Sequence, residues 1–275
     1  MNLTNKSEGK KYSDIVLSRS GSVGILTLNC PEKLNPLTPA MRSEMPEAIS
    51  EIARDDEIRV LVITGAGRAF CSGGDVSEVV TTIEKGGSVA RELVQSPIEP
   101  IAAWAADIFY LEKPVIAAVN GPAAGAGVGL GLLCDIVIAS EKATFSLAFV
   151  NRGVIPDVGL TYTLPRAVGR TKALELMFTG KRIDAGEAQR IGLVNEVIAH
   201  DGFMSSVMEV ANQLADAPPV AVQMMKRLVL SGLGREIERQ ILLENYGLHV
   251  CFSTADFKEG FQSFFEKRQP HFRGL

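Results

Sequence analysis

Residues 115–129 read Val115-Ile-Ala-Ala-Val-Asn-Gly-Pro-Ala-Ala-Gly-Ala-Gly-Val-Gly129, an apolar strand that runs through a glycine-rich loop into a helix start. Residues 60–75, Val60-Leu-Val-Ile-Thr-Gly-Ala-Gly-Arg-Ala-Phe-Cys-Ser-Gly-Gly-Asp75, repeat this order. Glycine and alanine let a ligand approach the main chain, and a helix start leaves backbone N–H groups without partners. Each loop can therefore offer an N–H to a developing negative charge. Together they predict a two-armed oxyanion hole.

Close packing and nucleotide binding are the simpler explanations of such loops. One glycine-rich turn between a strand and a helix is often only a packing device, but two in one chain weaken that explanation. The dinucleotide fingerprint G-x-G-x-x-G fails, because Leu130 and Phe70 stand where its third glycine belongs. Neither loop is followed by the Lys-Ser or Lys-Thr pair of a phosphate-binding loop. The sequence therefore disfavours a nucleotide-binding site.

Composition is that of a globular enzyme. A chain of 275 residues can bury a sizeable core, and its net charge of −4 argues against a nucleic-acid partner. Residues 1–11 contain no apolar core of a secretory signal, and polar residues and glycines interrupt the apolar stretch 114–139, so we expect no membrane span. The cysteines lack metal-ligand spacing, so we expect no metal and reduced thiols in the cytoplasm; they are Cys30, Cys71, Cys134 and Cys251.

Short strands and helices are predicted to alternate up to about residue 200. Thr38 and Pro39 are typical of an N-cap and a first helical residue, for a helix that runs to about Ala53. Asp184-x-x-Glu187 is a capping box for a short helix that Gly192 should end. The predicted strands are 23–28, 60–64, 115–119, 135–139 and 143–147. After His200 only helices are predicted, at 203–216, 219–231, 234–249 and 254–267.

The two loops carry a family resemblance. Gly65–Asp75, Ala117–Gly127 and Cys134–Ala139 resemble the enoyl-CoA hydratase/isomerase, or crotonase, family. The resemblance covers nearly the whole chain from about residue 15, and it continues through Phe145, 153–159, 164–169 and 259–268. It implies an α/β fold with a β-β-α spiral core, residues 12–200, that binds acyl-CoA, and a C-terminal helical trimerisation region, residues 201–275. A homotrimer or a dimer of trimers is the implied assembly.

What the resemblance implies for chemistry is an enzyme that holds the thioester oxygen of an acyl-CoA as an enolate. Matching the motifs assigns the two backbone donors to Gly74 and Ala126. Coenzyme A enters as the thioester substrate, and no permanently bound cofactor is implied. Hydratases of this family use two carboxylates, but Gly129 and Phe149 stand at those positions here. The sequence therefore disfavours hydration.

Asp157 is the carboxylate that remains, in Gly153-Val-Ile-Pro-Asp-Val-Gly159. Pro-Asp-x-Gly alone is a turn composition. Together with Phe145-Ser-Leu-Ala-Phe149, however, it resembles the ring-epoxide (1,2-epoxyphenylacetyl-CoA) isomerase branch, in which this aspartate is the acid/base. One carboxylate suffices for isomerisation, because the proton taken from one carbon returns to another. Apolar neighbours such as Val158 would favour its neutral form by desolvation.

The resemblance also implies a coenzyme A pocket near Lys33 and Leu34, with Arg68 near the phosphates. Phe264 and Lys267 would reach the ligand of a neighbouring subunit. Exposed basic residues are also commonly only solvating, so that alternative stays open. Trp104 and Phe109 fit the core and the acyl pocket equally well, and Phe149 fits the acyl pocket.

The remaining polar candidates have structural explanations. Asp75-x-x-Glu78 is more typical of a helix capping box than of a catalytic pair. No Ser or Cys lies in a G-x-S-x-G setting, so a hydrolytic triad is disfavoured. The sequence predicts an acyl-CoA isomerase with Asp157 as proton shuttle. The alternatives are an enoyl-CoA hydratase, a hydrolase or dehalogenase that uses Asp157, and a non-catalytic acyl-CoA-binding subunit.

Overall fold

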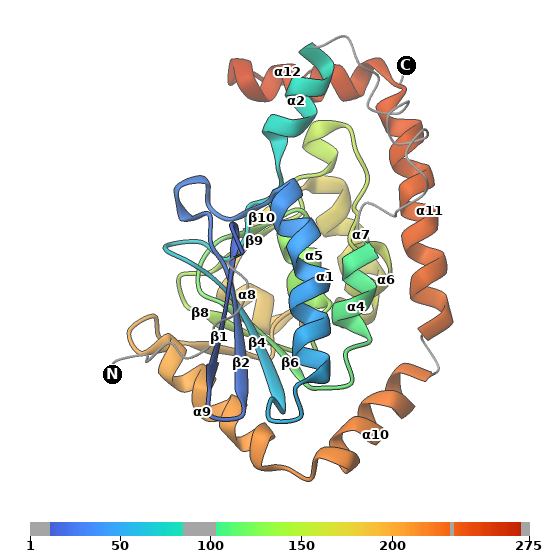
Figure 1. Ribbon diagram of the computed structural model, residues 1–275. Helices are drawn as coiled ribbons and strands as arrows, with labels where there is room; N and C mark the ends of the chain where they lie inside the picture. Colours follow the sequence, from blue (N-terminus) through green and yellow to red (C-terminus); the bar gives the residue numbers. More distant parts are fainter. Residues whose placement is uncertain (1–11, 85–102, 232–233, 271–275) are drawn as a thin grey trace.

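A six-stranded sheet forms the centre of the computed structural model, which describes residues 12–84, 103–231 and 234–270. Its strands follow the order β1-β2-β4-β6-β8-β11; β1 pairs antiparallel with β2, and all other neighbours are parallel (Figure 1). The strands are β1 (Ile15–Ser20), β2 (Val23–Leu28), β4 (Val60–Gly65), β6 (Val115–Val119), β8 (Ile136–Ser140) and β11 (Glu196–Ile198). The predicted strands at 23–28, 60–64 and 115–119 are confirmed almost residue for residue.

The parallel strands β2, β4, β6 and β8 are each followed by a very short second strand, after the 3-10 helix η1 in the case of β2, and a further short strand follows helix α7. These short strands pair with one another outside the main sheet, in the order β10-β9-β7 and as the pair β3-β5. The chain thus repeats a strand-strand-helix unit, which is the spiral expected from the resemblance. The short strands are β3 (Pro36–Leu37), β5 (Gly73–Gly74), β7 (Ala123–Ala124), β9 (Thr144–Ser146) and β10 (Arg182–Asp184).

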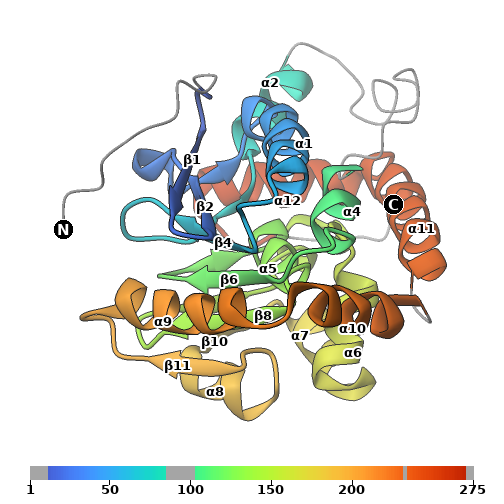
Figure 2. The ribbon, with the colours of Figure 1, turned by 60° about the horizontal axis from the view of Figure 1, so that its bottom comes forward.

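Both faces of the main sheet are buried, because alternate residues of a strand point to opposite faces. Val60 and Val62 of β4 pack in the cluster that contains helix α9, whereas Leu61 and Ile63 pack in the larger cluster that contains helices α1 and α4. The two views agree that α9 covers one face and that α1 and α4 cover the other (Figure 1, Figure 2). A strand buried on both faces explains the continuous apolar run that the sequence shows at residues 60–63.

Local signals place the helix ends. The Thr38 hydroxyl accepts the Met41 N–H at 3.0 Å, and Asp184 accepts the Glu187 N–H at 2.8 Å, as predicted. Asp75 caps its helix too, by accepting the Ser77 N–H at 3.0 Å. The helices up to residue 200 are η1 (Pro31–Lys33), α1 (Pro39–Arg54), α2 (Val76–Glu84), α4 (Ala103–Phe109), α5 (Ala126–Leu132), η2 (Val150–Arg152), α6 (Leu160–Val168), α7 (Arg170–Thr179) and α8 (Ala185–Arg190).

Four helices follow residue 200, as expected: α9 (Phe203–Asp216), α10 (Pro219–Ser231), α11 (Gly234–Phe252) and α12 (Ala255–Glu266). Helix α9 packs on the sheet, and Lys226 ties α10 to the core by donating to Asp135 at 2.6 Å and to the Lys113 carbonyl at 3.1 Å. A domain boundary between residues 200 and 201 stays a prediction. Among the described helices, none has the length and apolar composition needed to cross a bilayer.

Asn35 joins the loop around Cys30 to the first glycine-rich loop. It is fully buried and has a left-handed backbone, with φ of 54°. Its side-chain N–H groups donate to the carbonyls of Ala66 and Ala69 at 2.9 Å each, and that of Phe70 lies at 3.3 Å. Its side-chain oxygen accepts the Cys30 N–H at 2.9 Å. The Asn35 side chain thus supplies hydrogen-bond partners for several backbone groups that burial separates from water.

We expect Asn35→Ala to lower the free energy of unfolding by about 3 kcal/mol, because several buried polar groups lose their partner. Asn35→Gly keeps the left-handed conformation without strain. The stability that this variant loses therefore reports the side-chain hydrogen bonds alone. Urea denaturation would measure both, with the exposed Asn212→Ala on α9 as control. Wild-type stability in Asn35→Gly would show that the clamp does not stabilise the fold.

Candidate active site

The two glycine-rich loops contact each other through main-chain atoms. Strand β5 ends the first loop at Gly74, and helix α5 begins at Ala126 after the second. A methyl group on Gly73 would lie 2.6 Å from the carbonyl oxygen of Ala124 and 3.4 Å from the nitrogen of Ala126, so this approach requires glycine. The Ala124 N–H also donates to the Cys71 carbonyl at 2.9 Å. The start of α5 therefore lies beside the strand that ends at Gly74.

Both predicted oxyanion donors occupy positions suited to that role. Ala126 is the first residue of α5, where N–H groups have no acceptor within their own helix. Gly74 is exposed, and a methyl group on it would meet no atom of the described residues within 4 Å, so its main chain borders open space. The two donors come from separate strand-loop units, as the sequence predicted. Their role as an oxyanion hole stays a prediction.

Asn120 holds the first loop in place, a role that the sequence analysis missed. Its side-chain N–H groups donate to the carbonyls of Gly65 and Gly67 at 2.9 and 3.0 Å, and its oxygen accepts the Gly65 N–H at 3.2 Å. Asn120 follows β6 directly, at the carboxyl edge of the parallel strands. A polar side chain at this edge is the signal that could have found it.

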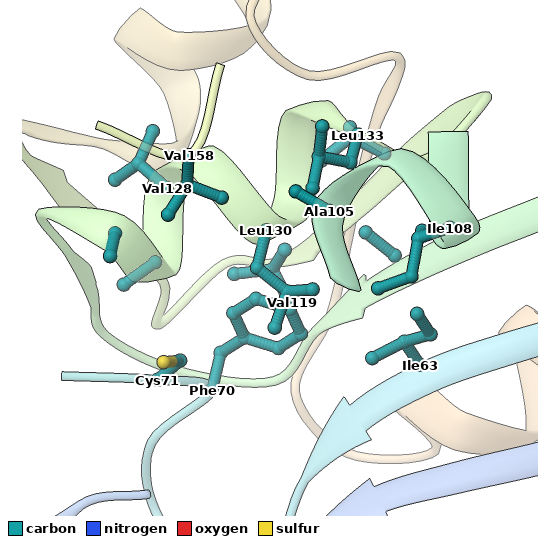
Figure 3. Close-up of a cluster of buried hydrophobic side chains, with 14 of the residues drawn as sticks. Ile63, Phe70, Cys71, Ala105, Ile108, Val119, Val128, Leu130, Leu133 and Val158 are labelled. Atoms are coloured by element: carbon teal, nitrogen blue, oxygen red, sulfur yellow. The ribbon is translucent and has the colours of Figure 1, made fainter. Parts of the chain in front are cut away.

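Val158 fills the space beside Gly129, the first of the two positions where hydratases carry a carboxylate. A methyl group on Gly129 would lie 2.9 Å from the Val158 Cβ, so no larger residue fits unless Val158 moves. Val158 is buried, and it lies beside Val128 at helix α5, while Phe70 of the first loop packs under the same helix (Figure 3). Gly129 therefore differs from the hydratase residue in two ways: it has no carboxylate, and Val158 occupies the space that a side chain would need.

Phe149, at the second hydratase position, borders the oxyanion arm. Its ring carbon Cζ would lie 3.6 Å from a methyl group on Gly125, the residue that precedes Ala126. The ring is buried, as an acyl-pocket wall would be. Position 149 thus presents hydrocarbon where a hydratase would present an acid.

Asp157 lies in the loop between η2 and α6, directly before Val158. Its carbonyl accepts the Leu160 N–H at 3.0 Å, and its Oδ1 is buried. Val158 has φ of 54°, a conformation that is strained for a β-branched residue and that tight surroundings must hold. Because Val158 packs on Gly129, one turn after Ala126, this loop lies against helix α5. The proton-transfer role of Asp157 stays a prediction.

Three of the predicted coenzyme A residues gather around the first loop. Lys33 ends η1 and Leu34 follows it; their carbonyls accept the hydroxyl and the N–H of Ser72, at 3.4 and 2.9 Å. Arg68 is an exposed residue of the same loop, next to Gly67. These contacts bring Lys33, Leu34 and Arg68 to the arm that carries Gly74. They leave coenzyme A binding untested.

Phe264 and Lys267 lie elsewhere, at the end of α12. Both are exposed, and Lys267 ends the helix in a left-handed conformation. Helix α12 packs on η2, so the two residues belong to the side of the molecule from which the Asp157 loop starts. Their reach to a neighbouring subunit's ligand remains a prediction.

Trp104 and Phe109 lie on α4 and are buried in the larger core cluster. Phe109 packs edge-on against Tyr110 and Tyr162, with ring centroids 5.2 and 6.4 Å away. The core assignment is therefore correct for both residues. A role of Trp104 and Phe109 in lining the acyl pocket stays a prediction.

Thiol groups near the loops are held neutral. Burial raises the pKa of Cys71 to about 12, and burial together with the nearby Asp14 raises the pKa of Cys30 to about 11. A neutral thiol is a poor nucleophile and a poor base at neutral pH. Cys71, although it lies in the first loop, is thereby a packing residue.

Comparison with known proteins agrees with this geometry. The sequence profile of the family described as enoyl-CoA hydratase/isomerase matches residues 18–274. The chain is 37% identical over 264 residues to the short-chain-enoyl-CoA hydratase of Clostridium acetobutylicum, covering 94% of this chain and 97% of that protein. It is 36% identical over 258 residues to the 1,2-epoxyphenylacetyl-CoA isomerase of Escherichia coli strain K12, covering 90% and 94%.

Solved structures give the same answer. The crystal structure of an enoyl-CoA hydratase from Mycobacterium avium subsp. paratuberculosis K-10 superposes with a TM-score of 0.82 at 33% sequence identity, and covers 96% of this chain and 100% of that one. The expected crotonase fold is thereby confirmed. With a family profile over nearly its full length and paired glycine-rich arms in contact, the chain belongs to the enoyl-CoA hydratase/isomerase family.

Proposed function

We propose that the chain is an acyl-CoA isomerase that works through a thioester enolate. The N–H groups of Gly74 and Ala126 would hold the thioester oxygen, and Asp157 would carry the proton. The observation that carries this proposal is the replacement of both hydratase carboxylates by hydrocarbon, with Val158 occupying the space at Gly129. Water therefore has no pair of acids to hold it.

The proposed reaction conserves every atom of the substrate. The Asp157 carboxylate removes a proton from the carbon beside the thioester carbonyl, and the charge moves to the oxygen held by the two N–H groups. The carboxylic acid then returns the proton to another carbon of the dienolate, and the double bond moves. The buried Val158 and Phe149 favour this step, because an apolar wall strengthens the hydrogen bonds to the oxyanion.

Hydration is the second candidate, favoured by the names of relatives. The Clostridium protein carries the name of a hydratase and the Escherichia coli protein that of an isomerase, at nearly equal identity. The site residues, not the overall similarity, therefore have to separate the two reactions. The four free cysteines support a further proposal, a cytoplasmic location.

We also propose assembly as a homotrimer or a dimer of trimers. Helix α10 exposes apolar side chains three and four residues apart, which is the pattern of a helix face that packs on a partner. Lys226 holds the opposite side of the helix on the core, so this apolar face points outward. The exposed residues are Val220, Met224, Met225, Leu228 and Val229.

The reaction can be decided with crotonyl-CoA, a 3-enoyl-CoA and an epoxyphenylacetyl-CoA. We expect isomerisation of one of the last two and hydration of crotonyl-CoA well below the ordinary enzyme rate of about 10 per second. Mass spectrometry detects water gain and thioester loss, and a change in ultraviolet absorbance at unchanged mass detects isomerisation. Gly129→Glu alone should add no hydration, since Val158 blocks the new side chain. Rapid hydration by the wild type would establish the second candidate.

Asp157→Asn should reduce isomerisation by about 10²- to 10⁴-fold while leaving coenzyme A affinity and melting temperature near the wild type, because the amide keeps the turn but cannot carry a proton. Exchange of the substrate's acidic hydrogens in deuterated water should stop with it. The exposed Asp201→Asn removes the same charge elsewhere and serves as control. An unstable variant with full activity per folded molecule would make Asp157 a turn residue only.

Val229→Asp should shift the protein toward smaller species in light scattering, because a charge on the α10 face cannot be buried against a partner. Val229 is 69% exposed and Phe178 on α7 is 70% exposed, so Phe178→Asp is a matched control outside this face. A wild-type protein that is already monomeric, or equal behaviour of both variants, would contradict the proposed assembly surface.

A further inference from the structure

Helix α11 carries two buried polar atoms that make no hydrogen bond within the described residues. They are Nδ2 of Asn245 and Nε2 of His249, which we call the α11 polar pair. Buried polar atoms in folded proteins nearly always have a partner, so these exceptions need an explanation. The two residues are four apart on one helix, which places their side chains on the same face with their Cβ atoms about 6 Å apart. One small polar group can therefore reach both atoms.

The backbone fixes which atom of the pair donates and which accepts. Nδ1 of His249 lies 2.5 Å from the Asn245 carbonyl oxygen. A carbonyl only accepts, so Nδ1 carries the ring proton and, in the neutral imidazole, Nε2 presents a lone pair. The amide nitrogen of Asn245 only donates. A hydroxyl group, which accepts and donates at once, matches both atoms.

The face that carries the pair belongs to the helix that packs on the Asp157 loop. A methyl group on Gly247, between the two residues of the pair, would lie 2.3 Å from Cδ1 of Ile155, two residues before Asp157. At the other end of the loop, a methyl group on Gly159 would lie 3.5 Å from Cδ1 of Ile237, which is also on α11. Helix α11 therefore follows the loop on both sides of Asp157.

The pair lies toward the part of a substrate that is distant from its thioester. The Asp157 loop packs on α5 through Val158 and on α11 through Ile155. Both views show α5 near the centre of the molecule and α11 at its edge (Figure 1, Figure 2). A substrate whose thioester oxygen reaches the start of α5 would meet α11 with the far part of its acyl group.

We propose that the α11 polar pair binds a hydroxyl group on the distal part of the acyl group, with Asn245 donating to its oxygen and His249 accepting its hydrogen bond. The inference rests on the proposed acyl-CoA function and adds a substrate class to it. A hydrocarbon acyl group would leave both atoms of the pair without partners. An ether, epoxide or carbonyl oxygen would match Asn245 only. The pair thus favours hydroxylated acyl-CoA thioesters.

Calorimetric titration with thioesters that lack a double bond to move tests the proposal without turnover. The ligands are phenylacetyl-CoA with its three ring-hydroxylated forms, and hexanoyl-CoA with ω-hydroxyhexanoyl-CoA. The wild type should bind at least one hydroxylated form about tenfold more tightly than its parent, the scale of one or two buried hydrogen bonds. Asn245→Leu and His249→Phe should each remove this preference by weakening that form alone. His249→Gln, whose side-chain oxygen accepts the same hydrogen bond, should keep part of it.

The control variants change the same residue types away from this face. Asn212 is an exposed residue of α9. His200 follows β11, where its Nδ1 lies 2.9 Å from the Ser140 hydroxyl, so its replacement also removes a hydrogen bond. Asn212→Leu and His200→Phe should both keep the wild-type preference.

Equal binding of every hydroxylated form and its parent by the wild type overturns hydroxyl recognition, and this result decides even if no variant folds. Equal weakening of parent and hydroxylated form by both Asn245→Leu and His249→Phe, or an unchanged preference in both, also overturns it. The pair would then be structural, with a buried water as its partner. Failure of the wild type to bind any of the thioesters would instead overturn the acyl-CoA function itself.

Discussion

The close main-chain contact between the two glycine-rich loops is the constraint on which the site depends. Side chains would keep these loops several ångströms apart, but the absence of one at Gly73 lets β5 approach the start of α5. The strand that ends at Gly74 thereby lies beside Ala126, so the two proposed oxyanion donors come together from distant parts of the sequence. The asparagines Asn35 and Asn120 hold the first loop from two sides, so the contact is rigid before a ligand arrives.

A second constraint lies where Val158 packs on Gly129. Val158 has a backbone conformation that its branched side chain disfavours, and its buried packing on Gly129 is one of the contacts that hold it. The same contact leaves no room for a larger residue at Gly129 unless Val158 moves, and Asp157 directly precedes Val158 in the chain. A side chain at position 129 would therefore displace both Val158 and the backbone that carries Asp157.

Local signals in the sequence were sufficient for the elements and insufficient for the contacts between them. The Thr38 and Asp184 caps and the bounds of α9 and α10 follow from residues within a few positions of each other. The two-residue strands, the Asn35 clamp and the Val158–Gly129 contact join positions that are far apart in the sequence. The spacing of apolar residues along the sequence does not predict such long-range pairings. The candidate site residues came from family motifs, which carry these contacts implicitly.

The position of α9 has a consequence for how the chain folds during synthesis. Val60, Val62 and Ile116 are covered on one face of the sheet only when residues 203–216 are present. A ribosome-bound chain that has completed every strand still displays a bare apolar sheet face until α9 emerges. The two glycine-rich loops would be complete at that stage, but the exposed apolar face of the sheet would be a surface for misassembly with other chains. The covering of this face by α9 is therefore a late step that completes the sheet.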